Sequence, residues 1–175
     1  KTMRKISFGT VKGGTGVTTS ALAYAIHLAK IDKDEKILYV GALNQIEYLL
    51  DLTGVKLMSP TGNEYTRFAI GNIAFAPYSK RLAAIGAEKP TTLIRDVGLI
   101  LNHYQKEQSE ELYYIHPNEE TVIDEITKYR PINNGIEIRY PLELLHKVQA
   151  QVADMPLHAT KEFEELGKII YKTVK

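Results

Sequence analysis

The feature that most constrains this chain is a glycine-rich turn over residues 8–19, which reads Phe-Gly-Thr-Val-Lys-Gly-Gly-Thr-Gly-Val-Thr-Thr. An apolar strand pattern over residues 6–8 precedes it, and a helical pattern over residues 18–30 follows it. Glycines let the backbone approach an anion because no Cβ stands in the way, and N–H groups at a helix N-terminus favour negative charge. The stretch therefore predicts a cradle for the phosphates of a nucleotide. The alternative is a plain strand-to-helix turn that needs glycines for close packing.

One charged group that a full phosphate-binding loop carries is missing from this turn. Such a loop has a lysine that reaches the β- and γ-phosphates, followed by a Ser or Thr whose hydroxyl coordinates Mg²⁺. Val17 stands at the lysine position. A cation placed there commonly contributes on the order of 3 kcal/mol, or about a hundredfold in rate. We therefore expect ATP hydrolysis to be weak or absent and assign no catalytic residue, whereas the backbone N–H groups and the helix dipole still favour binding.

The loop resembles that of the ParA/MinD family of partition and positioning ATPases, Lys-Gly-Gly-x-Gly-Lys-[Ser/Thr]-[Ser/Thr]. The resemblance implies that Lys12 is the signature lysine, which crosses a nucleotide-sandwich dimer, and that Thr18 is the magnesium ligand. The implied cofactor is ATP or ADP with Mg²⁺, and the implied cradle consists of Lys12, Gly13, Gly14, Thr15, Gly16, Val17, Thr18 and Thr19. The loop is also similar to that of TadZ/CpaE pilus-positioning relatives, in which the loop lysine is replaced as well.

Outside the loop the resemblance is partial. Relatives place Asp-x-Asp-Pro-Gln after their second strand, but here Gly41 and Leu43 replace both acids while Gln45 remains. Asn102, at the end of the apolar run 97–102, resembles an asparagine that reads the adenine edge in relatives, with a turn-capping Asn as the alternative. The resemblance also implies that the neighbourhood of Tyr140 and Pro141 lines a base pocket. Since the Asp-x-x-Pro-Pro strand of relatives is not found, the chain resembles a family member that is shortened through its middle.

Periodicity predicts the remaining elements. Strand patterns cover residues 36–40, 67–70, 72–77 and 136–140, and helical patterns follow residue 45, cover 119–129, begin at Pro141 and end the chain. A strand-helix-strand crossover at the start implies a parallel sheet. We predict one domain over residues 1–175, of the α/β class, with a three-layer, mostly parallel sheet and flanking helices, P-loop NTPase-like and reduced in the middle.

Composition excludes several other classes of protein. No apolar run approaches the roughly 20 residues that span a bilayer, so we expect no membrane span. The absence of cysteine excludes disulfides and thiolate metal sites, and the first residues lack the apolar stretch of a secretion signal, so we expect a cytoplasmic protein. There is no nucleophile elbow around a serine. His103 and His116 flank an acidic stretch that a surface loop explains better than a metal site.

The net charge of the chain and its resemblance to the ParA/MinD family together limit the partners that we expect. The formal net charge of +1 gives no global positive field, so a DNA contact needs a local patch. Lys80 with Arg81, or Arg130 with Arg139 and Lys147, are the candidates for such a patch, and a solvated charged face is the alternative. The resemblance implies a homodimer that acts in plasmid or chromosome partition or in cargo positioning. The alternative is a non-catalytic pseudo-ATPase that docks a partner ATPase, a DNA-bound adaptor protein or DNA.

Overall fold

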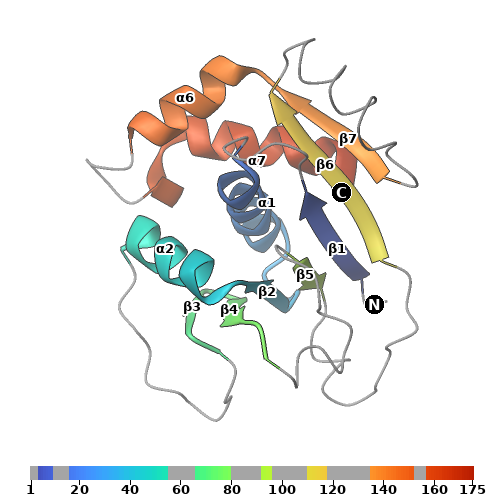
Figure 1. The fold of residues 1–175 in the computed structure, drawn as a ribbon, viewed down its shortest axis with the longest axis vertical. Coiled ribbons are helices and arrows are strands. Elements are labelled where there is room, and N and C mark those ends of the chain that lie inside the picture. The colour runs from blue at the N-terminus through green and yellow to red at the C-terminus, as the bar shows by residue number, and fades with distance from the viewer. Residues whose placement is uncertain are drawn as a thin grey trace. The chain divides into compact units, whose positions relative to one another are not determined.

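The computed structural model describes residues 4–9, 16–54, 66–79, 92–95, 110–117, 135–151 and 157–175. These residues form a seven-stranded mixed sheet, four α-helices and a short 3-10 helix, which confirms the α/β class (Figure 1). The strands are β1 (Arg4–Gly9), β2 (Ile37–Gly41), β3 (Phe68–Ile70), β4 (Ile73–Pro77), β5 (Thr92–Arg95), β6 (Glu110–Pro117) and β7 (Gly135–Tyr140). The helices are α1 (Val17–Ile31), α2 (Leu43–Thr53), α6 (Leu142–Ala150), α7 (Lys161–Val174) and the 3-10 helix η1 (Leu157–Ala159). Along the sheet the strands follow the order β3-β4-β2-β5-β1-β6-β7.

The chain divides into two compact units, each assembled from two separate stretches of sequence. The first unit consists of residues 1–7 and 28–111, and the second of residues 8–27 and 112–175. Strand β1 and helix α1 therefore each contribute residues to both units. The single domain and the three-layer arrangement that the sequence suggests stay predictions.

In the first unit, the sheet departs from the parallel arrangement that the sequence implies. Strand β5 is antiparallel to both β1 and β2, and Arg95 is in register with Arg4 on one side and Ile37 on the other. Strands β1 and β2 thus point the same way without being neighbours. Beyond them, β4 is parallel to β2, and β3 is antiparallel to β4. The crossover from β1 to β2 predicts their common direction correctly, but it gives no sign of the antiparallel strand between them.

The core of the first unit is aromatic. Phe68 and Phe75 stack with ring centroids 4.3 Å apart, and Tyr39 lies 5.3 Å from Phe75. A tight turn at Gly71 and Asn72 joins β3 to β4, and Gly71 has a φ of 56°, which favours glycine. The predicted strands over 67–70 and 72–77 are therefore confirmed as a hairpin. The side chain of Asn72 donates hydrogen bonds to the carbonyl oxygens of Asp32, at 3.2 Å, and Glu35, which fixes the hairpin to the connection before β2.

Helix α2 confirms the short amphipathic helix predicted before Gly54. Its apolar side chains are buried, namely Ile46, Leu49, Leu50 and Leu52. The helix ends where Gly54 adopts the left-handed conformation, with a φ of 64°. It packs on β2 and β4.

In the second unit, the first part of α1 is buried on all sides, because every residue from Thr19 to Ile26 is buried. Small side chains allow close approach of a neighbouring helix: a Cβ added to Gly167 of α7 would lie 2.5 Å from the carbonyl oxygen of Ala23. The rings of His27 and Tyr171 also meet edge to face, 5.1 Å apart. The predicted N-terminal and C-terminal helices are therefore confirmed, and they form one tight helix-helix contact.

Strands β6 and β7 complete the second unit as a parallel pair against which α7 lies (Figure 1). The strand predicted over 136–140 is confirmed. The surface loop predicted around the acidic stretch is wrong for residues 110–117, since these residues form β6. Tyr113 and Ile115 alternate on the buried side of β6, and Tyr113 packs on Phe8 of β1. The strand predicted over 97–102 and the helix predicted over 119–129 lie outside the described residues.

Candidate functional site

The candidate site begins where α1 begins. Strand β1 ends at Gly9, and α1 starts at Val17 directly after Gly16, whose φ of 80° is left-handed and therefore favours glycine. The carbonyl of Gly16 accepts the first hydrogen bond of the helix from Ser20 N at 2.8 Å. The first turn of α1 holds no acidic side chain. The first backbone N–H groups of an α-helix are not used by the hydrogen-bond ladder of the helix itself, so this end of α1 electrostatically favours an anion.

Two side chains of the second unit close around Gly16. A Cβ added to Gly16 would lie 2.6 Å from Leu145 Cδ1 in α6 and 3.3 Å from Tyr140 Oη at the end of β7. Tyr140 and Leu145 are both buried. The backbone at the start of α1 is therefore covered on this side by one apolar group and one phenol, and a Cβ at position 16 would require the side chain of Leu145 to move.

Burial raises the pKa of the Tyr140 phenol far above its ordinary value. The hydroxyl therefore stays neutral at any physiological pH. A neutral hydroxyl beside the start of α1 adds hydrogen-bonding capacity without repelling an anion. Sequence periodicity indicates that Tyr140 lies on the inner face of its strand, but it does not indicate that this face meets Gly16.

The predicted hydroxyl residues of the loop lie inside the helix rather than at its cap. Since α1 begins at Val17, Thr18 and Thr19 occupy its first turn, and neither takes the capping position before the helix. Val17 and Thr18 are half-buried, whereas Thr19 and Ser20 are buried. Of the residues in this turn that carry a hydroxyl group, Thr18 is therefore the most exposed. Ser20 Oγ is buried without a hydrogen-bond partner among the residues that the structure describes, which is unusual for a buried hydroxyl.

The second predicted position, at the end of β2, lies in the first unit. The side chain of Gln45 lies over the Cα of Gly41, so that its Oε1 occupies the place where a Cβ of residue 41 would stand. Leu43, the other residue at an acidic position of the related family, is 58% exposed at the first position of α2. The segment from Gly41 to Gln45 therefore supplies the side-chain amides of Asn44 and Gln45 and no carboxylate.

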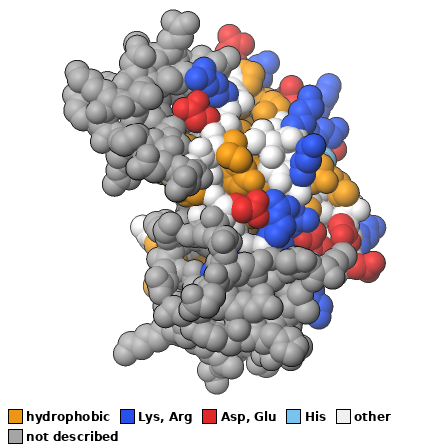
Figure 2. All heavy atoms as spheres, turned by 90° about the vertical axis from the view of Figure 1, so that its right-hand side faces the viewer, with side chains coloured by type: hydrophobic (Ala, Val, Ile, Leu, Met, Phe, Trp, Pro, Cys, Tyr) orange, Lys and Arg blue, Asp and Glu red, His pale blue; other side chains and the backbone are white. Residues whose placement is uncertain are grey.

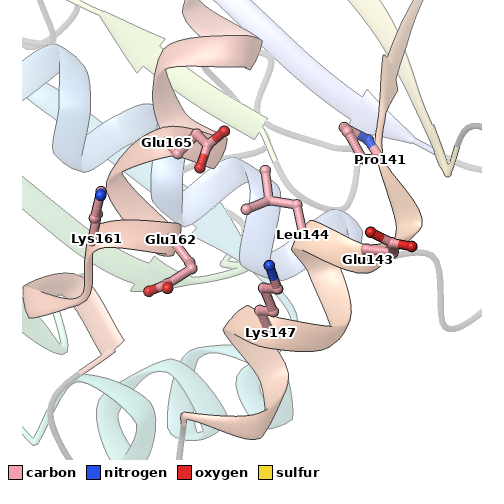
Figure 3. A pocket seen from close by; sticks show the side chains of 7 residues that line it. All are labelled: Pro141, Glu143, Leu144, Lys147, Lys161, Glu162 and Glu165. Carbon is pink, nitrogen blue, oxygen red and sulfur yellow. The ribbon is translucent and has the colours of Figure 1, made fainter.

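Pro141 precedes α6 and lines a pocket of about 330 Å³ between α6 and α7. Figure 3 shows the lining side chains, which come from the residue before α6, from α6 and from the start of α7: Pro141, Glu143, Leu144, Lys147, Lys161, Glu162 and Glu165. Ligand pockets for flat bases are mostly apolar. This pocket instead holds three carboxylates and two ammonium groups, so its chemistry differs from that of the adenine pocket that the resemblance implies at Pro141.

The carboxylate of Glu162 in this pocket is held in its charged form. Gln151 Nε2 donates a hydrogen bond of 2.7 Å to Glu162 Oε2, and this bond is the main cause that lowers the pKa of Glu162. The charges of Lys147 and Lys161 lower it further. The positive and negative charges of the lining residues therefore largely offset one another, and the pocket presents no strong charge of one sign.

The basic patch predicted for DNA is described only in part. Arg139 pairs with Glu137 at 3.3 Å, and Lys147 lies among the carboxylates of the pocket. On the face drawn in Figure 2, basic and acidic side chains both occur among hydrophobic ones where the surface is described. These neighbours favour the solvated charged face over a patch that attracts DNA.

Several predicted residues lie outside the described residues: Lys12, Gly13, Gly14, Thr15, Asn102, Lys80, Arg81, Arg130 and His103. Of the predicted site, the structure brings Gly16, Val17, Thr18 and Thr19 to one helix start. Within the described ranges, no group of three or more His, Cys, Asp or Glu side chains is arranged to hold a metal ion. In the same part of the chain, no helix is both long and apolar enough to cross a membrane.

No sequence pattern indicates one further polar feature, a buried ion pair in the first unit. Arg95 forms a two-pronged interaction with Glu35, in which Nε donates to Oε1 and Nη2 donates to Oε2 at 3.0 Å. The side chain of Glu35 is 3% exposed and that of Arg95 is 14% exposed. Arg95 is anchored by β5, so the pair links the loop before β2 to the strand inserted between β1 and β2.

Comparison with known proteins yields no match. No family model, no curated protein and no solved structure matches this chain.

Proposed function

We propose that this protein is a ParA-like nucleotide-binding protein with weak or no ATP hydrolysis, which acts in DNA partition or cargo positioning. The observation that carries the proposal is the start of α1. A strand leads through a glycine-rich segment to a left-handed Gly16 and then to a helix whose first turn is free of acids. This arrangement favours the phosphates of a nucleotide.

Bound Mg²⁺ would neutralise part of the phosphate charge, and Thr18 is the residue proposed to contact it. Thr18 fits this role because it is half-buried in the first turn, while its neighbour Thr19 is buried. Tyr140 supports the same proposal, because its neutral hydroxyl lies beside Gly16.

The weakness of hydrolysis follows from side chains that lack charge. Val17 is apolar where a cation normally stabilises the transferring phosphoryl group. At the end of β2, the side chain of Gln45 occupies the space beside Gly41, and Leu43 carries no oxygen that organises water or a metal ion. The proposed role is therefore nucleotide-dependent binding rather than rapid turnover.

The first experiment is thermal unfolding with and without Mg-ATP or Mg-ADP. A ligand that binds only the folded state at a hundredfold excess over its Kd adds about 2.7 kcal/mol of stability, or roughly 5–10 °C for a chain of this size. We expect Thr18→Ala to lose the magnesium-dependent part of this shift. Thr173→Ala is the matched control, since residue 173 is an exposed helical threonine in α7.

A second experiment measures ATP hydrolysis by the wild-type chain and by Val17→Lys. We expect little activity in the wild type and a gain in the variant, provided that hydrolysis does not need the two acids that Gly41 and Leu43 replace. The absence of any thermal shift at millimolar nucleotide would contradict nucleotide binding. That result would favour the pseudo-ATPase that docks another protein or DNA.

A further inference from the structure

Strand β7 ends the sheet, and no strand among the described residues pairs with its outer edge. Its one partner in the described part of the chain is β6, which it pairs with over six residues. The opposite end of the sheet is β3, which is only three residues long. An edge of six residues can accept another strand, whereas a very short edge strand is protected from doing so. In Figure 1, β7 is the orange strand beside β6.

The side chains of β7 are segregated by polarity between its two faces. Ile138 and Tyr140 are buried on one face. On the other face Glu137 and Arg139 form an ion pair of 3.3 Å in which the side chains are 30% and 44% exposed. Ile136 belongs to the apolar face by the alternation of a strand, but it is 52% exposed. The strand thus leaves one large apolar side chain uncovered.

A second copy of β7 complements this edge if it runs antiparallel with Ile138 on the twofold axis. Residues whose numbers sum to 276 are then opposite one another, so that Glu137 faces Arg139 of the second copy. Ile136 faces Tyr140 of the second copy, which gives the exposed side chain an apolar neighbour. Opposite charges across strands are favourable and like charges are unfavourable.

The neighbouring registers of this strand pair place like charges opposite one another. A slip of one residue would move the side chains of one strand to the opposite face of the sheet. The possible registers therefore differ by two residues, and the sum of the paired residue numbers changes by two. Of the two nearest alternatives, a sum of 274 places Glu137 opposite itself, and a sum of 278 places Arg139 opposite itself. Charge therefore selects a single register for self-pairing.

We propose that this chain forms a dimer by antiparallel pairing of β7 with β7 of a second copy, and that this dimer needs no nucleotide. The interface is distinct from the nucleotide-sandwich dimer that the resemblance at Lys12 implies. Glu137, Arg139 and their two symmetry mates form a ring of alternating charges across it. The proposal is independent of whether the start of α1 binds a nucleotide.

The test is the dissociation constant of the dimer, measured by sedimentation equilibrium in nucleotide-free buffer. Arg139→Glu and Glu137→Arg each turn two attractive cross-strand pairs into repulsive ones, and we expect each to weaken the dimer by about tenfold or more. An equimolar mixture of the two variants should dimerise again, because one strand is then acidic and the other basic. The double variant E137R/R139E should also regain the wild-type constant, since it reverses every pair at once.

Lys168→Glu is the matched control, because Lys168 forms an exposed ion pair with Glu164 on α7, with 3.7 Å between the charged atoms. It makes the same change in net charge as Arg139→Glu, and we expect it to leave the dimer unchanged. Circular dichroism establishes that every variant is folded. A wild-type chain that stays monomeric at several hundred micromolar, or a dimer that Arg139→Glu leaves intact, would overturn the proposal.

Discussion

Gly16 is the position at which a single added methyl group tests the geometry of the candidate site. The substitution Gly16→Ala places a Cβ 2.6 Å from Leu145 Cδ1 and 3.3 Å from Tyr140 Oη, at a φ of 80°. Two separate costs arise. A left-handed conformation costs an L-residue about 1–2 kcal/mol, and a methyl group forced into a filled space costs about 1–3 kcal/mol. We expect the sum, about 2–5 kcal/mol, to be lost from the free energy of unfolding.

The assay is urea unfolding followed by circular dichroism. With a slope near 2 kcal/mol/M, the expected loss lowers the midpoint by about 1–2.5 M. Gly54→Ala is the control that separates the two costs, because Gly54 has a similar φ of 64° but nothing lies within 4 Å of an added Cβ. Gly54→Ala should therefore lose only the conformational cost, about 1–2 kcal/mol.

A double-mutant cycle with Leu145→Ala measures the steric part directly. Leu145→Ala alone removes a buried side chain and should cost about 2–5 kcal/mol. In the double variant the methyl group introduced at position 16 enters the space that Leu145 vacates. The double variant should therefore lose about 1–3 kcal/mol less stability than the sum of the two single losses. Equal losses for Gly16→Ala and Gly54→Ala, together with an additive cycle, would refute the packing described at the start of α1.

Further substitutions test three other parts of the structure. Gly167→Ala should destabilise the fold by about 1–2 kcal/mol in urea unfolding despite the better helix propensity of alanine, because its Cβ meets a backbone oxygen that cannot swing away. Arg95→Met leaves the buried Glu35 unpaired and should cost about 3 kcal/mol in the same assay, and an added Glu35→Met should recover most of it. Gln151→Ala should raise the pKa of Glu162 toward its ordinary value, as followed by NMR of the carboxyl carbon. Because the folded pKa of Glu162 is lowered, its stabilising contribution is present above the ordinary pKa and disappears as the pH falls through the folded value.

The sequence predicts local structure well where a stretch has a strong hydrophobic period or where a glycine marks the end of a helix. The helical spacing of Ala21, Leu22 and Ile26 predicts α1, and Gly54 marks the end of α2. These signals act over a few residues, so distant parts of the chain do not alter them.

Features that depend on distant pairing are the ones the sequence does not reveal. Strand β5 is four residues long and pairs with β1 across about 90 residues of sequence, so no local pattern marks it. Strand β6 begins within the acidic stretch, at Glu110 and Glu111, and the short alternation of its buried Tyr113 and Ile115 does not stand out from a charged surface segment. At the candidate site, the spacing of the loop predicts the start of α1, but the approach of Leu145 arises from tertiary packing alone.

The interleaved course of the chain decides which fragments of this protein are worth making. Residues 8–27 lie, in sequence, between the two stretches of the first unit, and residues 28–111 lie between those of the second. No single proteolytic cut or truncation can then release either unit by itself. A fragment that ends at residue 111 carries residues 8–27 of the second unit along with the first unit, and a fragment that starts at residue 112 lacks the helix against which Gly167 packs. Truncated fragments would expose that helix's binding surface, and their aggregation would say nothing about the stability of the intact chain.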